Sequence, residues 1–154
     1  MPPSVTDRLR ASPLIAASGA VALLVLVAAV GGLVTFVGPG AFPDPGGRRL
    51  GTAILAAMVG VAVLWLLVVA RAVRGVVDYA DAGERPTGLG FALAVVEGSV
   101  ATGMLVIASA AGSLSNTAGE TEVLAIGAYL VAVVGVGLAL ASLTRAGVAF
   151  LGPA

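Results

Sequence analysis

Residues 89–114 read LGFALAVVEGSVATGMLVIASAAGSL, an apolar run whose only ionisable residue is Glu97. At about 1.5 Å per residue, the run is long enough to cross the roughly 30 Å hydrocarbon layer of a bilayer. The same rise places Glu97 roughly 12 Å below Leu89, slightly short of the midplane. We therefore predict a membrane-spanning helix that carries one buried carboxyl group.

The two faces of this predicted helix differ when the residues are plotted at about 100° each. Large apolar side chains share one face, as expected of a surface in contact with lipid: Leu89, Leu93, Val96, Val100, Met104, Ile107 and Leu114. Small residues share the face that includes Glu97: Gly90, Ala94, Gly98, Ala101, Ala108 and Gly112. Small residues let another helix backbone come close. The pattern therefore predicts that Glu97 points toward protein.

The composition of the whole chain is that of a membrane protein. Of its 154 residues, 59% are hydrophobic and 10% are charged, and the mean hydropathy is +1.11, whereas about a quarter of the residues in soluble domains are charged. Cysteine and histidine are absent, which excludes zinc clusters, haem ligation, thiolate nucleophiles and His-based triads. Asp44, Asp78 and Asp81 all fall in predicted loops, so the predicted spans contain no pair of aspartates for an intramembrane hydrolase. We therefore expect no enzyme activity, no metal and no cofactor.

Three further apolar runs predict three more spans and hence an all-α membrane protein, a four-transmembrane-helix bundle. The predicted spans are 14–37, 50–70, 89–112 and 123–144, in a single domain of residues 13–154 that follows a cytoplasmic leader of residues 1–12. Ser12 and Pro13 indicate the start of the first span, as an N-cap followed by proline at the first helical position. A cleaved signal peptide is the alternative for this run. However, nothing charged occurs between Ala11 and Pro43, whereas a signal h-region is typically about 7 to 15 residues long.

Turn-forming or polar residues connect the predicted spans. Residues 38–49 read GPGAFPDPGGRR, and their glycine and proline content predicts a turn. Arg74 and Asp78 have the i, i+4 spacing that would extend the second helix beyond the membrane as a turn or two. Gly83 then indicates the end of that helix.

The last span carries a regular series of small residues at alternating steps of three and four. The series, here called the alanine seam, is Ala125, Ala128, Ala132, Gly135, Ala139, Ser142 and Ala146. Such a seam suits close, left-handed packing against another helix. The small residues around Glu97 follow the same steps, with Leu105 as the exception. The pattern therefore predicts that the third and fourth helices form a tight hairpin along close-packed small-residue seams.

The arginines predict that both termini are cytoplasmic, because positive residues favour that side. All eight basic residues are arginines. With both ends inside, the cytoplasmic side holds Arg8, Arg10, Arg71, Arg74, Arg85 and Arg145, and the outer side holds Arg48 and Arg49. The net charge is zero, which argues against a nucleic-acid partner. We expect a protein integral to the membrane, in the cell membrane of a prokaryote.

Glu97 is the candidate functional residue. An ionised carboxylate near the middle of a bilayer costs about 2.5 to 3.5 kcal/mol on insertion scales, so such a residue is a functional hypothesis by default. Counting depth along each span finds no cation at its level, although Arg71 or Arg145 could reach part of the way by snorkelling. We therefore expect a protonated Glu97 that donates a hydrogen bond to a hydroxyl or a backbone carbonyl. The candidate partners are Ser18, Thr102 and Ser142.

The sequence is compatible with two functions. We expect a structural or accessory protein that acts through helix packing in the lipid bilayer, with a second copy or another membrane protein as partner. The alternative is a small carrier or channel that uses Glu97 to move protons or cations. Transport usually needs a chain of polar groups across the membrane, and Thr102, Ser109 and Ser113 lie near Glu97 on the same predicted helix. A polar, water-reachable cavity at Glu97 would favour transport, whereas a dry helix contact would favour architecture.

Overall fold

The computed structural model describes residues 2–37, 47–83, 85, 87–116 and 120–152. These residues form five helices and no strand: α1 (Val5–Ala11), α2 (Pro13–Val37), α3 (Arg48–Ala82), α4 (Leu89–Ser115) and α5 (Glu120–Leu151). Helices α2 to α5 are each long and apolar enough to cross a membrane, as the sequence predicts. Most of the turn predicted for residues 38–49 lies outside the described residues.

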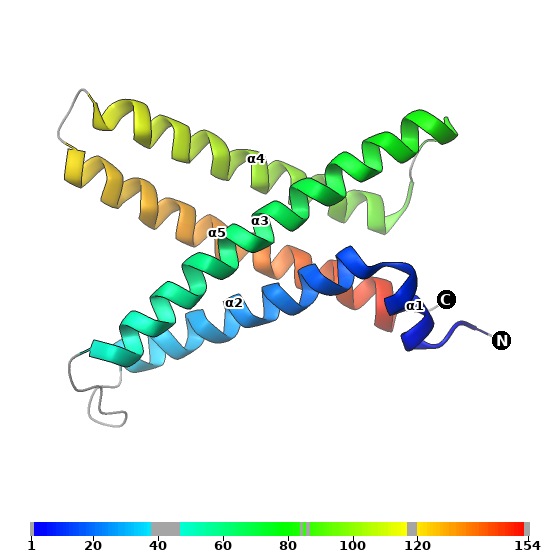
Figure 1. Ribbon diagram of the computed structural model, residues 1–154, viewed down its shortest axis with the longest axis horizontal. Coiled ribbons are helices and arrows are strands. Elements are labelled where there is room, and N and C mark those ends of the chain that lie inside the picture. The colour runs from blue at the N-terminus through cyan, green and yellow to red at the C-terminus, as the bar shows by residue number, and fades with distance from the viewer. Residues whose placement is uncertain (1, 38–46, 84, 86, 117–119, 153–154) are drawn as a thin grey trace.

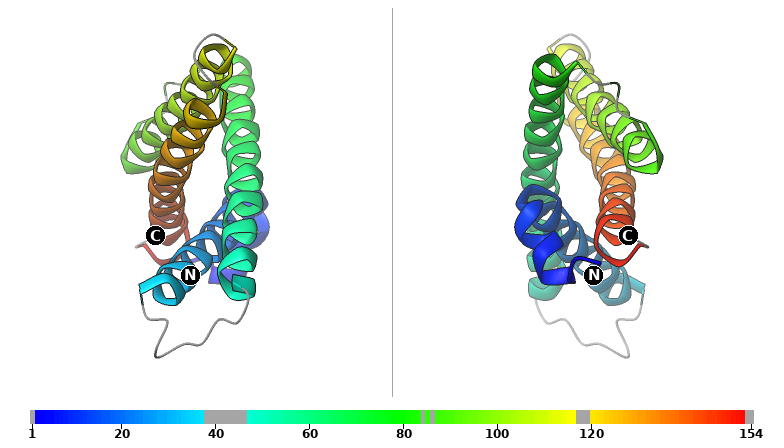
Figure 2. Two further views of the ribbon diagram at one scale, coloured as in Figure 1. Left: turned by 90° about the vertical axis from the view of Figure 1, so that its left-hand side faces the viewer. Right: turned by 90° about the vertical axis from the view of Figure 1, so that its right-hand side faces the viewer.

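The four long helices form two hairpins that cross one another. α2 packs along α3, α4 packs along α5, and α2 also packs along α5, whereas α3 has far fewer contacts with α4 and α5. Figure 1 shows the hairpins crossing near the middle of the molecule, and the end views of Figure 2 show them diverging away from that crossing. Both chain termini lie at one end of the molecule, together with the starts of α2 and α4 and the ends of α3 and α5.

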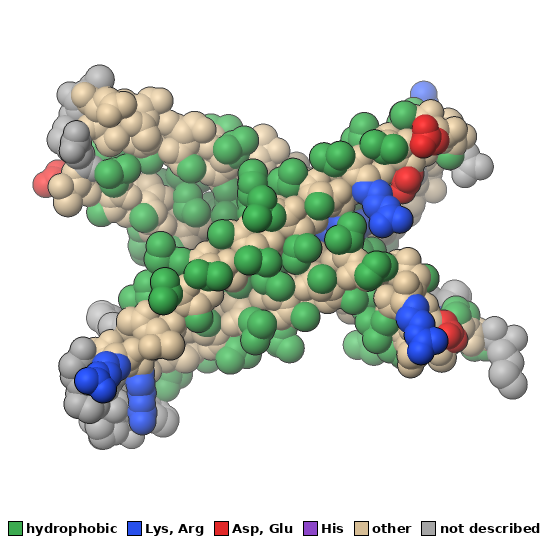
Figure 3. All heavy atoms as spheres, in the orientation of Figure 1, with side chains coloured by type: hydrophobic (Ala, Val, Ile, Leu, Met, Phe, Trp, Pro, Cys, Tyr) green, Lys and Arg blue, Asp and Glu red, His purple; other side chains and the backbone are tan. Residues whose placement is uncertain are grey.

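The core of the protein lies at this crossing and draws on all four long helices. It consists of Ala22, Val25, Val61, Leu64, Val68, Ala101, Met104, Leu138 and Ala139. Met104 was predicted to face lipid and is instead buried, because α3 crosses α4 at its level. Elsewhere the surface is apolar: at most 22% of the residues in the most apolar window of each span are buried, and hydrophobic side chains cover the surface between the charged ends (Figure 3). Helices that are hydrophobic on all sides are typical of membrane spans.

The helix ends follow local signals that the sequence carries. The Ser12 carbonyl accepts a hydrogen bond from the Ala16 N–H at 3.1 Å, so α2 begins at Pro13 as predicted. Gly83 ends α3 in a left-handed conformation with φ 69°, which glycine adopts without steric cost, and its N–H bonds to the Tyr79 carbonyl. The predicted extension of this helix beyond the second span is therefore confirmed.

The polar leader contains a short helix, α1, that was not predicted. Ser4 and Asp7 form a reciprocal cap: the Ser4 hydroxyl accepts from the Asp7 N–H, and the Asp7 carboxylate accepts from the Ser4 N–H, both at 3.2 Å. The Arg8 guanidinium then donates to the carbonyl of Gly152 at 2.8 Å. This contact places a cation at the negative end of α5 and joins the two ends of the chain.

Candidate functional site

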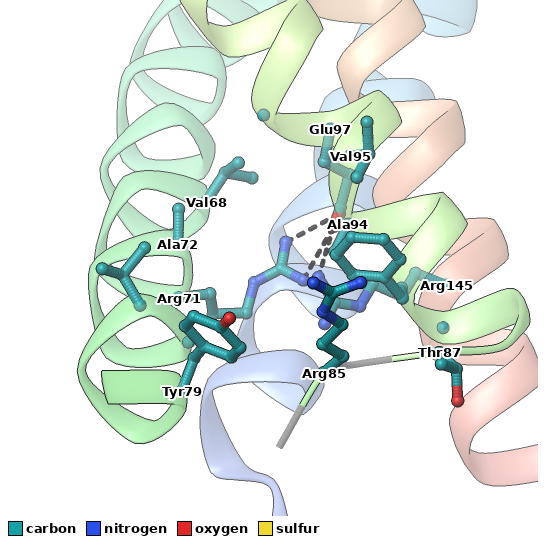
Figure 4. Close-up of a pocket in the computed structure, with 15 residues that line it drawn as sticks. Val68, Arg71, Ala72, Tyr79, Arg85, Thr87, Ala94, Val95, Glu97 and Arg145 are labelled. Carbon is teal, nitrogen blue, oxygen red and sulfur yellow. Dashed lines mark hydrogen bonds and ion pairs between the residues drawn. The ribbon is translucent and has the colours of Figure 1, made fainter. Parts of the chain in front are cut away.

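Glu97 lies on the face of α4 that is turned toward α3 and α5, and its side chain is 1% exposed. Both of its carboxylate oxygens accept hydrogen bonds from arginines on those two helices. Figure 4 shows the guanidinium groups of Arg71 and Arg145 converging on the carboxylate. We call Arg71, Glu97 and Arg145 the charge cluster.

Arg71 binds Glu97 through two parallel hydrogen bonds. Its Nη2 donates to Oε1 at 2.7 Å and its Nη1 donates to Oε2 at 3.0 Å. This two-point geometry matches the planar guanidinium to the carboxylate and is the stronger form of such a pair. The Arg71 side chain is 6% exposed, so both members of this ion pair are buried.

Arg145 supplies a third hydrogen bond from α5. Its Nη1 donates to Glu97 Oε2 at 2.8 Å, and its side chain is 21% exposed. The carboxylate therefore joins α3, α4 and α5 at one point. Two guanidinium groups face one carboxylate, so the cluster carries one uncompensated positive charge.

The prediction of a protonated Glu97 without a cation at its level is therefore wrong. It assumed that Arg71 and Arg145 close their helices at the membrane boundary. In the structure α3 continues from Arg71 to Ala82 and α5 continues from Arg145 to Leu151. Arg71 and Arg145 therefore lie within their helices rather than at the helix ends. Because the hairpins cross obliquely (Figure 1), both arginines reach the level of Glu97.

The three predicted partners of Glu97 lie in different environments. The Ser18 hydroxyl donates to the Leu14 carbonyl on its own helix, and the exposed Thr102 hydroxyl donates to the Gly98 carbonyl. The buried Ser142 hydroxyl lies close to the Glu97 carboxylate, but it forms no hydrogen bond of ordinary geometry with any described residue. Of the three, the structure brings only Ser142 near Glu97.

Two members of the alanine seam of α5, Gly135 and Ala146, make close contacts with α3 and α2. A Cβ added at Gly135 would lie 2.8 Å from Val61 on α3, and Ala146 lies where Gly19 of α2 comes close. Ala139 and Ser142 are also buried, whereas Ala125, Ala128 and Ala132 are exposed. The predicted hairpin of α4 and α5 is present, but the closest contacts of Gly135 and Ala146 are with other helices.

The close approach of α4 and α5 occurs on a different face of α5. A Cβ at Gly127 would meet the Ala111 Cβ at 2.5 Å, and Gly127 is not a member of the seam. The exposed seam residues Ala128 and Ala132 instead line an apolar cavity of about 800 Å³, at the end of the molecule opposite the chain termini.

A second cavity, of about 710 Å³, adjoins the charge cluster between α3 and the first turns of α4. Arg85, in the connection between these helices, extends toward the cluster (Figure 4). Arg85 makes no hydrogen bond or ion pair with the residues that the structure describes. The cavity therefore has a positively charged inner end, whereas most of its lining is apolar.

A hydrogen bond from Trp65 separates the two cavities. The Trp65 indole N–H donates to the Ala101 carbonyl at 3.0 Å, which links α3 to α4 one turn beyond Glu97. The core residues Leu64 and Met104 are buried at the same crossing. Beyond the charge cluster, the apolar core thus separates the second cavity from the first one.

No protein-family model matches this chain, and no curated protein or solved structure matches it either. The comparisons therefore supply neither a fold relative nor a functional one. What the protein does has to be inferred from the geometry of the charge cluster and the cavities. The observation with the clearest physical meaning is the ion pairing of Glu97 with two other helices.

Proposed function

We propose that this chain is a small integral membrane protein with a structural or accessory role, performed through helix contacts. In this proposal the four long helices cross the membrane as a bundle of two hairpins, with both termini in the cytoplasm. The membrane is the cell membrane of a prokaryote. The exposed apolar faces would contact lipid, a second copy of the chain, or another membrane protein.

The main support for this proposal is that the two carboxylate oxygens of Glu97 accept hydrogen bonds from arginines on two other helices. α3 has few contacts with α4 and α5, so the ion pair of Arg71 with Glu97 supplies a cross-link where packing is thin. The ion pair of Arg145 with the same carboxylate connects this cross-link to α5. A carboxylate held in this way is suited to fixing the relative position of three helices. It is less suited to taking up and releasing a proton at each transport cycle.

The distribution of arginines supports the proposed orientation. Arg8, Arg10, Arg74 and Arg85 belong to the segments at the end of the molecule where both termini lie, whereas Arg48 and Arg49 start α3 at the opposite end. The side with more arginines faces the cytoplasm in most membrane proteins. The chain has no cysteine, so one introduced thiol reports its own location.

Labelling with a membrane-impermeant maleimide tests the orientation. Glu122→Cys, near the start of α5, should react in intact cells, and Asp78→Cys, near the end of α3, should react only after lysis. Both side chains are exposed, so a difference in reactivity reports the side of the membrane. The reverse pattern would contradict the proposed orientation.

Proton or cation transport is the second candidate, favoured by the cavity that reaches Glu97. Against it, the Trp65 contact and the apolar core separate that cavity from the one at the opposite end of the molecule. The Thr102 hydroxyl is exposed and bound to its own helix, so it adds no step to a polar path. We therefore favour the structural role.

Flux measurements in proteoliposomes decide between the two candidates. We expect the full-length protein to conduct protons and monovalent cations no faster than liposomes without protein. If it does conduct, a folded variant with the charge cluster replaced by apolar residues (Arg71→Met, Glu97→Leu, Arg145→Met) identifies the pathway. Flux that disappears in this variant would overturn the structural role in favour of a carrier.

A further inference from the structure

The cavity beside the charge cluster has more positive than negative charge among its described lining residues. Arg71, Arg85 and Arg145 line it together with one carboxylate, Glu97. The Nε of Arg71 is buried and has no partner among the described residues. A buried N–H group without a partner is costly, and an anion is the natural acceptor. The polar end of the cavity is therefore complementary to a negatively charged group.

The rest of the cavity is apolar and lined by small residues. On α4, Gly90 and Gly98 leave room because a Cβ at either position meets nothing within 4 Å, and Gly75 on α3 does the same. Val76 and Phe91 are exposed at the rim. The volume, about 710 Å³, lies within the roughly 300 to 1,000 Å³ of ordinary ligand sites.

These features together describe a site for an amphiphile with an anionic head. We infer that the cavity binds an anionic phospholipid, with its phosphate at Arg85 and the charge cluster and its acyl chains along the apolar walls. The inference uses the membrane placement given under Proposed function, where this end of the molecule faces the anionic cytoplasmic leaflet. Basic pockets between transmembrane helices on that side are known to take anionic head groups.

Arg85 is the residue that tests the inference most cleanly. It lines the cavity but is bonded to no described residue, so Arg85→Gln should leave the fold intact. Arg74→Gln is the matched control, because Arg74 is an exposed arginine on α3 that does not line the cavity. The two variants remove the same charge from the same end of the molecule.

The measurement is native mass spectrometry of the full-length protein in detergent, titrated with phosphatidylglycerol or with phosphatidylcholine of the same acyl chains. We expect wild type to retain phosphatidylglycerol preferentially, and Arg85→Gln to lower that preference about fivefold, the effect of one basic residue. Arg74→Gln should lower it less than twofold. Equal retention of the two lipids, or equal effects of the two variants, would overturn the inference.

The apolar walls are tested separately from the charges. Gly98→Leu would fill the cavity, whereas Gly103→Leu adds the same side chain to α4 at a position that is also open but does not line the cavity. Loss of phosphatidylglycerol with Gly98→Leu alone is expected. Equal lipid retention by both variants would show that the cavity walls are not involved.

Inorganic phosphate distinguishes a lipid from a free anion. We expect millimolar phosphate to leave bound phosphatidylglycerol in place, because the acyl chains contribute to binding. Complete displacement would mean that the site holds a free anion and would overturn the assignment to a lipid. Binding in detergent depends neither on orientation nor on flux, so its failure and that of the proposed function can be told apart.

Discussion

Arg71 and Glu97 form a two-point ion pair between α3 and α4, with Nη2–Oε1 at 2.7 Å and Nη1–Oε2 at 3.0 Å. Arg145 of α5 donates to the same Oε2 atom. The shared carboxylate means that the three side chains act as one unit. Changes to any of them should therefore be strongly non-additive.

Glu97→Gln should destabilise the protein by about 3 to 5 kcal/mol, because it leaves the buried Arg71 and the partly buried Arg145 without their counter-charge. A protonated Glu97 that only donates a hydrogen bond, as the sequence predicts, would instead be replaced by glutamine almost without effect. Thermal unfolding in detergent measures the change. Glu122→Gln, at an exposed glutamate on α5, is the control and should be neutral. Equal melting temperatures for the two variants would contradict a structural role of the ion pairs.

Replacing the whole charge cluster with apolar residues should be far less harmful than removing Glu97 alone. In the variant Arg71→Met, Glu97→Leu, Arg145→Met no charge remains to be neutralised, and such replacements are often neutral or stabilising by about 1 to 4 kcal/mol. Its melting temperature should exceed that of Glu97→Gln. A variant as unstable as Glu97→Gln would mean that shape, rather than charge, governs this contact.

Gly135→Leu should destabilise the contact between α5 and α3. An added Cβ would lie 2.8 Å from Val61 Cγ1, and overpacking of this kind costs about 1 to 3 kcal/mol. Gly137→Leu is the control, because a Cβ there meets nothing within 4 Å. Unfolding curves of the two variants in the same detergent check this prediction. Coincident curves would contradict it, because they would show that α5 can shift without a loss of stability.

The cap of α1 should depend on pH. Hydrogen bonds from the Ser4 side chain and then the Ser4 backbone lower the pKa of Asp7, so the cap is fully present above the ordinary carboxyl pKa. It is lost as the pH falls through the lowered value, below about pH 4.

An NMR titration of the Asp7 carboxyl measures this pKa directly. Ser4→Ala should return it toward its ordinary value, whereas Thr6→Ala, which leaves Ser4 in place, should not. A titration of Asp7 that Ser4→Ala leaves unmoved would refute the capping interaction.

The helices themselves were predictable, because their signals are local. The apolar runs and the Ser12–Pro13 start rest on residues next to one another in sequence, and so does the end of α3 at Gly83. The cap of α1 also had a local signal, the three-residue spacing of Ser4 and Asp7, but the leader is polar and too short to suggest a helix by periodicity.

The partners of Glu97 were not predictable from local signals. Depth counting treats the spans as parallel rods, and it placed Arg71 and Arg145 at the ends of those rods. The crossing of the hairpins depends on contacts between distant residues, such as Gly135 with Val61 and Gly19 with Ala146. The same crossing explains why Gly135 and Ala146 of the alanine seam contact α3 and α2. A series of small residues indicates that a helix packs closely against it, but not which helix.

If the long helices cross the membrane as proposed, the charge cluster also bears on how the chain enters the bilayer during synthesis. An isolated arginine in the apolar layer costs about 2.5 to 3.5 kcal/mol, and α3 leaves the ribosome with Arg71 before any counter-ion exists. Glu97 follows on the next helix, α4, and neutralises Arg71. A nascent chain with three spans therefore already has equal positive and negative charge in the apolar layer. Arg145 comes last, and its surplus charge is accommodated only once the carboxylate is in place.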